Sequence, residues 1–109
     1  MDMNKSKRIQ QAMLLRAITI PERMQENYFS GGGVLRYLST LADEADAGKP
    51  LLPENDMPSP EQAKCLRNTP FMTAIRKMWS PDEVLQCFRN TADRIEAGEY
   101  LIPTDKAGR

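Results

Sequence analysis

The chain of 109 residues contains no histidine and only two cysteines, Cys65 and Cys87. Histidine is the side chain most often used in general acid–base catalysis, in Ser-His triads and in zinc binding, so its absence argues against these kinds of site. The two cysteines lack the spacing of metal ligands, and we predict that both are buried free thiols. We therefore expect no catalytic residue, no metal and no cofactor.

Long apolar runs and a net charge are also missing. No apolar run approaches the ~20 residues of a membrane span, and the amino terminus lacks the apolar stretch of a signal peptide. The 15 basic and 15 acidic residues cancel, so the chain as a whole has no bias toward nucleic acid or an anionic membrane. Its length suits one domain, 1–109, with a modest core and no room for a buried active site of several parts. We expect a cytoplasmic protein with no membrane partner and no small-molecule substrate.

Signals for helix starts occur along the whole sequence. The stretch "KSKRIQQAMLLRAI" places apolar residues at helical spacing, which predicts an amphipathic helix over 5–18. Gln62 and Glu83 each follow an N-cap serine at the spacing of a capping box. The N-cap residues that precede a proline at the first helical position are Ser59, Thr69 and Ser80. No stretch alternates with the period of a strand, so the predicted class is all-α, with about six short helices.

The second half of the chain repeats part of the first. "VLRYLSTLADEADAGKPLLP" (34–53) and "VLQCFRNTADRIEAGEYLIP" (84–103) share eight residues at an offset of 50. Gly48 and Gly98 fit the left-handed position that ends a helix. Each unit is therefore predicted to contain a short helix, a longer helix, a glycine stop and an apolar tail. The predicted order is an N-terminal helix over 5–18, unit A over 21–53, a proline-rich connection and helix over 49–69, unit B over 70–103 and a frayed tail over 104–109.

Both long helices carry an apolar stripe in the same register. Phe29 and Trp79 precede the N-cap serines, where each is expected to pack on a valine of the helix as a hydrophobic staple. One unit is too small to bury its own stripe, so we expect the two stripes to pack on each other about a pseudo-two-fold axis. The side chains expected to be buried together are Val34, Leu35, Leu38, Val84, Leu85, Phe88 and Ile95.

Two polar features leave alternatives open. Asp43 and Asp93 recur late in the long helices, where the helix dipole disfavours a carboxylate. They either hydrogen-bond the other unit's backbone or a basic side chain, or they share a metal or an acid–base role. The "GGG" over 31–33 lacks the strand and the Lys-Ser/Thr pair of a phosphate-binding loop, so it predicts a flexible or closely packed helix start.

Charge is uneven along the sequence. Basic residues crowd the first helix and the segment 64–77, whereas acidic residues dominate 43–61. We expect an electrically two-sided molecule whose basic face is either solvated or a nucleic-acid site. Methionine suits both irregular cores and adaptable binding surfaces, so we also expect an exposed apolar patch with a basic rim. The residues predicted to contact a partner are Arg67, Met72, Ile75, Arg76, Lys77 and Met78.

The segment "TADRIEAGEYLIP", and less closely "LADEADAGKPLLP", resembles the "ADxxEAGE" pieces of small proteins encoded by bacteriophages and prophages. The resemblance implies an accessory protein that binds a host enzyme or defence complex without catalysis of its own, and it defines no functional residue. We therefore hypothesise a small non-enzymatic protein-binding modulator, an inhibitor or adaptor acting on a host bacterial complex such as a nuclease or defence assembly. The alternative is a nucleic-acid-binding regulator that uses the basic face, and an enzyme is the third alternative.

Overall fold

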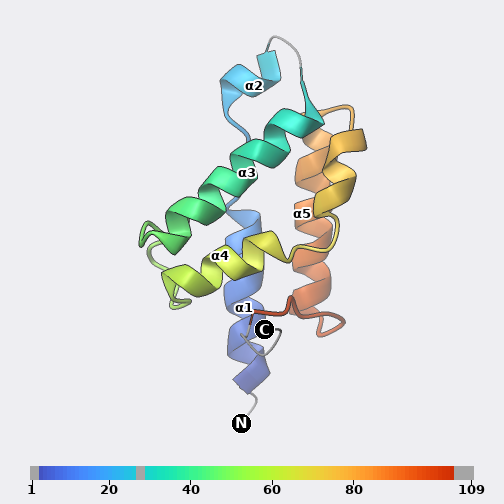
Figure 1. Ribbon diagram of the computed structural model, residues 1–109. Coiled ribbons are helices and arrows are strands. Elements are labelled where there is room, and N and C mark those ends of the chain that lie inside the picture. Colours follow the sequence, from blue (N-terminus) through green and yellow to red (C-terminus); the bar gives the residue numbers. More distant parts are fainter. Residues whose placement is uncertain (1–2, 27–28, 105–109) are drawn as a thin grey trace.

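The computed structural model describes the backbone of residues 3–26 and 29–104. Within these residues the chain forms six helices and no strand (Figure 1). They are α1 (Met3–Arg16), α2 (Glu22–Glu26), α3 (Gly31–Asp46), α4 (Ser59–Arg67), the 3-10 helix η1 (Met72–Lys77) and α5 (Pro81–Glu96). The prediction of an all-α fold with about six helices is confirmed. Apart from Thr104, the frayed tail expected over 104–109 lies outside the described residues.

The two long helices, α3 and α5, begin alike. Ser30 and Ser80 cap them, and each side-chain oxygen accepts a hydrogen bond from the backbone N–H three residues later, at 3.1 and 3.2 Å. In α5 the carboxylate of Glu83 also accepts from the N–H of Trp79, the residue before the cap, at 2.8 Å, so the bonding resembles a capping box that is shifted by one residue. In α3 the corresponding residue is Gly33, which has no side chain to make the second bond.

Both long helices also end alike. Gly48 and Gly98 have φ angles of 97° and 84°, in the left-handed region where a residue with a side chain is strained. The N–H that follows each glycine donates to the carbonyl five residues earlier, at 2.8 and 2.9 Å. This is the longer hydrogen bond of a Schellman motif, and the predicted glycine stops are confirmed.

Two other helix starts differ from the prediction. Ser59 is the first residue of α4 rather than its cap, because its hydroxyl donates to the carbonyl of Ala45 in the last turn of α3. There it helps to satisfy the carbonyls that a helix end leaves without partners. Thr69 likewise donates to the carbonyl of Cys65, at 3.1 Å, and the next helix begins only at Met72. The predicted caps at these two residues are wrong.

Trp79 does not form the staple expected of it. Its side chain is 87% exposed, whereas Phe29 of the first unit is half-buried against the core. Met78 and Ser80, on either side, have extended backbone angles, and successive side chains of an extended segment point in opposite directions. Because Met78 packs against the core, Trp79 projects into solvent.

The two apolar stripes enter one core, but they do not lie chiefly against each other. α3 packs on α4 and η1, and α5 packs on α1 (Figure 1). Leu35 and Leu85 are only partly buried. The other residues expected in the core are fully buried, and they are Val34, Leu38, Val84, Phe88 and Ile95. The side chains that α1 and α4 contribute to the same core include Leu14, Leu15, Cys65 and Leu66.

The helices that receive the two stripes are themselves a repeat. Residues 11–16 of α1 have the sequence QAMLLR, and residues 62–67 of α4 have the sequence QAKCLR, at an offset of 51. The first copy packs on α5 of the second unit, and the second copy packs on α3 of the first unit. The first helix of each half therefore packs on the long helix of the other half, and we call α1 and α4 the lent helices.

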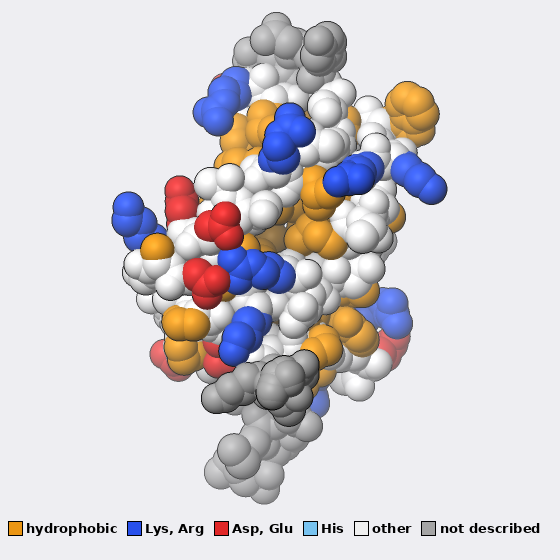
Figure 2. Space-filling view, in the orientation of Figure 1, with side chains coloured by type: hydrophobic (Ala, Val, Ile, Leu, Met, Phe, Trp, Pro, Cys, Tyr) orange, Lys and Arg blue, Asp and Glu red, His pale blue; other side chains and the backbone are white. Residues whose placement is uncertain are grey.

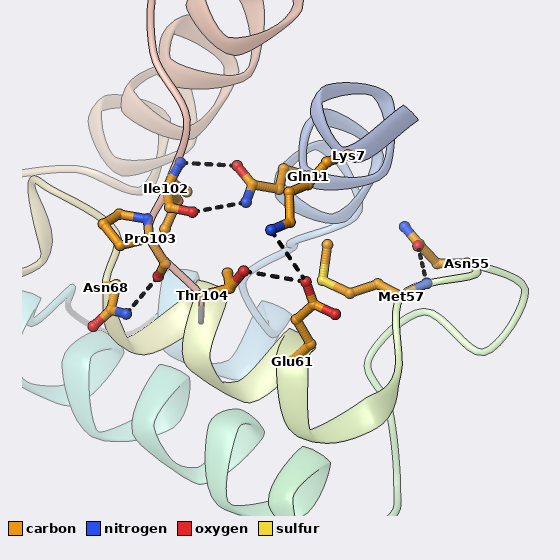
Figure 3. Close-up of polar contacts among 9 residues, drawn as sticks. All are labelled: Lys7, Gln11, Asn55, Met57, Glu61, Asn68, Ile102, Pro103 and Thr104. Carbon is orange, nitrogen blue, oxygen red and sulfur yellow. Dashed lines mark hydrogen bonds and ion pairs between the residues drawn. The ribbon is translucent and has the colours of Figure 1, made fainter. Parts of the chain in front are cut away.

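A buried glutamine joins each lent helix to the apolar tail of the unit that receives it. Gln11 donates its side-chain amide to the carbonyl of Ile102 and accepts from the N–H of the same residue, both at 2.9 Å. Gln62 makes the same two bonds to Leu52, at 3.1 and 3.2 Å. Figure 3 shows Gln11 facing Ile102, with the tail 102–104 lying between α1 and α4. Both glutamines are fully buried, so these bonds replace the water that each polar group loses.

The last residue of each lent helix is an arginine that binds two carboxylates of the long helix beside it. The four ion pairs are Arg16–Asp93 (2.7 Å), Arg16–Glu96 (2.8 Å), Arg67–Asp43 (2.7 Å) and Arg67–Asp46 (2.6 Å). Asp43 and Asp93 therefore bind basic side chains, which is one of the alternatives that the sequence left open. The expectation of an electrically two-sided molecule does not hold at Arg16 and Arg67, because carboxylates of the neighbouring helix lie beside both.

Candidate partner-binding groove

α3 carries more apolar side chain than its neighbours cover. It has 16 residues, whereas α4 has 9 and η1 has 6. An open groove of about 240 Å³ remains along α3, and Figure 2 shows apolar side chains in a hollow on this face. Its lining residues are Leu35, Leu38, Ser39, Ala42, Leu66, Arg67 and Met72. Most of these side chains are apolar, so the groove suits an apolar group of a ligand.

A close backbone contact fixes η1 against the start of α3. A Cβ atom on Gly31 would lie 2.1 Å from the carbonyl oxygen of Ile75, so no residue with a side chain fits there. Of the two roles expected for the glycines, close packing is the one found at Gly31. The contact also sets one wall of the groove, since η1 supplies Met72.

The groove continues toward the start of α3 as a second hollow of about 410 Å³. The two hollows share Leu35 and Ser39, so they form one continuous surface. Arg36 and Arg76 line the second hollow, and Lys77 is the next residue of η1. All three cations are exposed, and none forms an ion pair with a residue that the structure describes. This end of the groove is therefore positively charged and accessible to an anionic group.

The opposite end of the groove is electrically balanced. Arg67 binds the carboxylates of Asp46 and Asp43 at 2.6 and 2.7 Å. Their hydrogen bonds, that of Asp46 above all, raise the pKa of the Arg67 guanidinium above its ordinary value. An anion approaching Arg67 meets the repulsion of two carboxylates as well as the attraction of one cation.

The structure brings four of the six predicted partner-binding residues to this surface. Arg67 and Met72 line the groove, and Arg76 lines its basic extension. Lys77 is exposed beside Arg76 at the end of η1. Three of these four are cations, so the prediction of a basic rim is retained for the basic end and altered at Arg67, whose charge is compensated.

The other two predicted residues lie beneath the surface. Ile75 is fully buried, so the prediction that it contacts a partner is wrong. Met78 is half-buried against the core. A 3-10 helix has three residues per turn, so Met72 and Ile75 lie on one face of η1, and this face packs against the core. Met78 follows the helix and packs against the core as well.

Sequence reasoning missed two residues of the groove and the exposure of Trp79. Leu35 was expected in the core because it lies on the stripe of α3, but the short helices beside it leave it partly exposed. Arg36 follows it and lines the basic extension. Trp79 was assigned to the staple and is instead 87% exposed, the highest exposure among the large apolar residues that the structure describes. The usable signals were the shortness of the helix predicted to begin at Ser59 within the segment 49–69, and the alternation of Met78 with Trp79.

A further hollow of about 420 Å³ lies between α1 and the loop 54–56. Ile9 and Met13 are 42% and 46% exposed there. The rest of its lining is polar, and Asn55 holds the loop in place. Its side chain donates to the carbonyl of Gln10 at 2.9 Å and accepts from the N–H two residues later at 2.8 Å. This hollow is accounted for by the attachment of the loop to α1.

Other kinds of site find little support within the described residues. No three Cys, Asp or Glu side chains of this part of the chain come together in a way that could hold a metal ion. Burial, with a smaller contribution from Glu61, raises the pKa of the Cys65 thiol to about 12. Cys87 is also a free thiol but is only half-buried, so the prediction of two buried thiols is correct for Cys65 alone. Across 3–26 and 29–104, no helix has both the length and the apolar character needed to cross a bilayer.

The groove combines two modes of attraction. Its apolar centre can take up a hydrocarbon side chain from water, and its cationic end can bind carboxylates or phosphates. Asp43 and Asp46 disfavour a ligand that is anionic along its whole length. The chain matches no protein-family model, no curated protein and no solved structure.

Proposed function

We propose that the chain is a small non-enzymatic protein-binding modulator, a phage- or prophage-encoded inhibitor or adaptor. It acts in the bacterial cytoplasm on a host protein complex such as a nuclease or defence assembly. The observation that carries the proposal is the apolar groove of α3, which opens beside the exposed cations Arg36 and Arg76. The assignment of a host partner rests on the resemblance of the segment 91–103 to phage proteins.

The residue types around the groove are those on which protein interfaces depend most. Tryptophan and arginine are enriched among the residues whose truncation weakens binding, and such residues surround an apolar centre. Trp79 lies two residues beyond the end of η1 and presents its indole to solvent, where it does little for the fold. Truncation of an interface anchor of this kind costs about 2 kcal/mol or more, which is about a 30-fold loss in affinity.

A nucleic-acid-binding regulator is the second candidate, and the exposure of Trp79 favours it. An exposed indole next to Arg76 and Lys77 is a platform on which a single-stranded base can stack, at about 1–3 kcal/mol per base. The rest of the surface favours a protein. The phosphate backbone of a nucleic acid gains nothing from contact with the apolar centre of the groove. Its phosphates are also repelled by Asp43 and Asp46.

The proposal is tested by capture from a bacterial lysate with the tagged chain, before and after nuclease digestion. The informative variants are Arg76→Glu, which changes an exposed residue of the basic end, and Trp79→Ala, which removes the exposed indole three positions later in the chain. Arg89→Glu is the matched control, because Arg89 is an exposed arginine on α5 that does not line the groove. We expect a protein that is retained after nuclease treatment, lost with the two surface variants and kept with the control. Circular dichroism establishes that all variants are folded.

Two results would count against the proposal. One is a partner that disappears on nuclease digestion. The other is binding of arbitrary duplex or single strand at low salt that falls steeply as salt rises, with a log–log slope of about −0.9 per phosphate contact on duplex. If the triple variant Arg67→Ala/Arg76→Ala/Lys77→Ala abolished that binding, the nucleic-acid regulator would replace the modulator.

A further inference from the structure

We infer that the groove binds an acidic amphipathic helix of the protein partner, lying along α3. The inference rests on the proposed function, because it names the chemistry of the partner segment. The groove and its extension are lined by α3 residues from Gly32 to Ala42. At a rise of 1.5 Å per residue this stretch is about 15 Å long, which is the length of about three helical turns. A helix with apolar side chains at i, i+3 or i+4, and i+7 covers this length with one face.

The charges around the groove determine the composition of the bound helix. Arg36, Arg76 and Lys77 stand at the end nearest the start of α3 and have no carboxylate partner among the described residues. Carboxylates of a bound helix form charge-assisted hydrogen bonds with such cations. At the other end Arg67 is already held by two carboxylates, so further acidic residues are unwelcome there. The bound helix is therefore acidic at one end, apolar along its face and neutral or basic at the other end.

The same charges set the direction of the bound helix. Carboxylates stabilise a helix when they lie in its first turn and destabilise it in its last turn, because of the helix dipole. The acidic first turn consequently lies over Arg36 and Arg76, and the bound helix runs in the same direction as α3. Ser39 lines both hollows, so it lies beneath the middle of the bound helix.

Two synthetic peptides of about 14 residues, near the shortest length at which isolated helices form, test this inference. The first carries Glu in its first turn, Leu at i, i+4 and i+7, and Lys in its last turn, whereas the second keeps the Leu positions and exchanges Glu with Lys. Binding to the full chain is measured by fluorescence anisotropy of the labelled peptide. We expect the Glu-first peptide to bind at least about tenfold tighter, which is a difference that a single charge-assisted contact supplies.

Variants of the chain assign the binding to the groove. Arg76→Glu should remove the preference for the Glu-first peptide, since it reverses one of the three cations of the basic end. Ser39→Phe should abolish binding of both peptides, because Ser39 is exposed on α3 and the larger side chain fills the groove without changing the core. Arg89→Glu should leave both affinities unchanged, and circular dichroism verifies that each variant keeps its helical content.

Several outcomes overturn the inference. They are failure of both peptides to bind, equal binding of the two, and binding that survives Ser39→Phe. Self-association of the chain that Ser39→Phe abolishes would assign the groove to a second copy. Binding of a thymidine oligonucleotide at Arg76, when neither peptide binds, would assign the groove to nucleic acid. The capture experiment tests the proposed function separately. If a nuclease-resistant partner binds the parent chain but not Arg76→Glu, while neither peptide binds, the proposal of a protein-binding modulator is kept and the inference of an acidic helix is rejected.

Discussion

Replacing Gln11 by glutamate converts a buried pair of hydrogen bonds into a pH-dependent one. Gln11 is 0% exposed, and its side chain both donates to and accepts from the backbone of Ile102. A glutamate of nearly the same shape keeps the acceptor for the Ile102 N–H. When it is ionised it has no hydrogen to donate to the Ile102 carbonyl, and when it is protonated it restores both bonds.

The coupling between protonation and folding limits how much stability this substitution can remove. Burial and the neighbouring carbonyl disfavour the carboxylate, so the pKa of the glutamate in the folded state is raised above its usual value of about 4.3. The variant is therefore as stable as the parent below that pH, and it loses stability as the pH rises until the folded-state pKa is passed. Retaining the proton at pH 7 costs at most about 3.7 kcal/mol. A buried carbonyl without a donor costs about 1–3 kcal/mol, so we expect a loss of about 2–3 kcal/mol at pH 7.

The measurement is urea unfolding followed by far-ultraviolet circular dichroism between about pH 5 and pH 7. Gln86→Glu is the matched control, because Gln86 is exposed on α5 and its carboxylate would remain hydrated. Gln62→Glu should also lose stability as the pH rises, but it should be less stable than the parent at low pH too, because the Gln62 amide donates to the carbonyl of Met57 as well as to that of Leu52 and a protonated glutamate has one hydrogen to donate. If Gln11→Glu were no less stable than Gln86→Glu at pH 7, or lost the same stability at both ends of the pH range, the description of Gln11 as a buried clamp would be refuted.

Three further predictions concern packing. Gly31→Ala should destabilise the chain by about 1–3 kcal/mol, because its Cβ would lie 2.1 Å from a carbonyl oxygen of η1. Gly33→Ala, whose nearest contact would be at 3.5 Å, should be neutral or stabilising in the same urea assay. Equal effects of the two substitutions would contradict the close contact at Gly31. Leu85→Ala should cost about 1–2 kcal/mol, below the range of about 2–5 for a fully buried leucine, and a larger loss would show that Leu85 is core. A disulfide reagent at neutral pH should modify the half-buried Cys87 in the native chain. It should react with Cys65 only on unfolding, because Cys65 is buried and burial raises the pKa of its thiol to about 12. The reverse order of reaction would contradict the burial of Cys65.

Local signals predicted the helices well because each of them acts over a few residues. Ser30 and Ser80 cap their helices, and Gly48 and Gly98 end them, in the way that their side chains or lack of side chains dictates. Packing partners are a different kind of information. An apolar stripe shows which side of a helix is buried and does not show which helix will cover it, so the exchange of α1 and α4 between the halves could not be derived from periodicity.

The repeat of the lent helices was present in the sequence but escaped a comparison at a single offset. Arg16 lies 14 positions before Ser30, whereas Arg67 lies 13 positions before Ser80, so the offset changes from 51 to 50 within each half. A search that allowed one deletion between α1 and α3 would have aligned Gln11 with its counterpart. The shared QA and LR letters would then have indicated that the first helix belongs to the repeat.

The groove was predicted only in part, and for a physical reason. The basic residues of η1 were visible in the sequence, but the exposure of Leu35 depends on the length of α4 and on the depth at which η1 packs against Gly31. The compensation of Arg67 depends on carboxylates more than 20 positions away in the sequence. Such contacts exist only once the helices have assembled.

The two glutamine clamps are chemically alike but close very different lengths of chain. Gln62 and Leu52 are 10 positions apart, whereas Gln11 and Ile102 are 91 positions apart. The entropy of loop closure grows with the logarithm of length, so the longer closure costs about 2 kcal/mol more. During synthesis α3, α4 and the first tail can associate as soon as they leave the ribosome, while α1 keeps its apolar stripe exposed until α5 has been added, and Gln11 gains its partner only with residue 102. Among the described helices, α1 therefore waits longest between its synthesis and its packing.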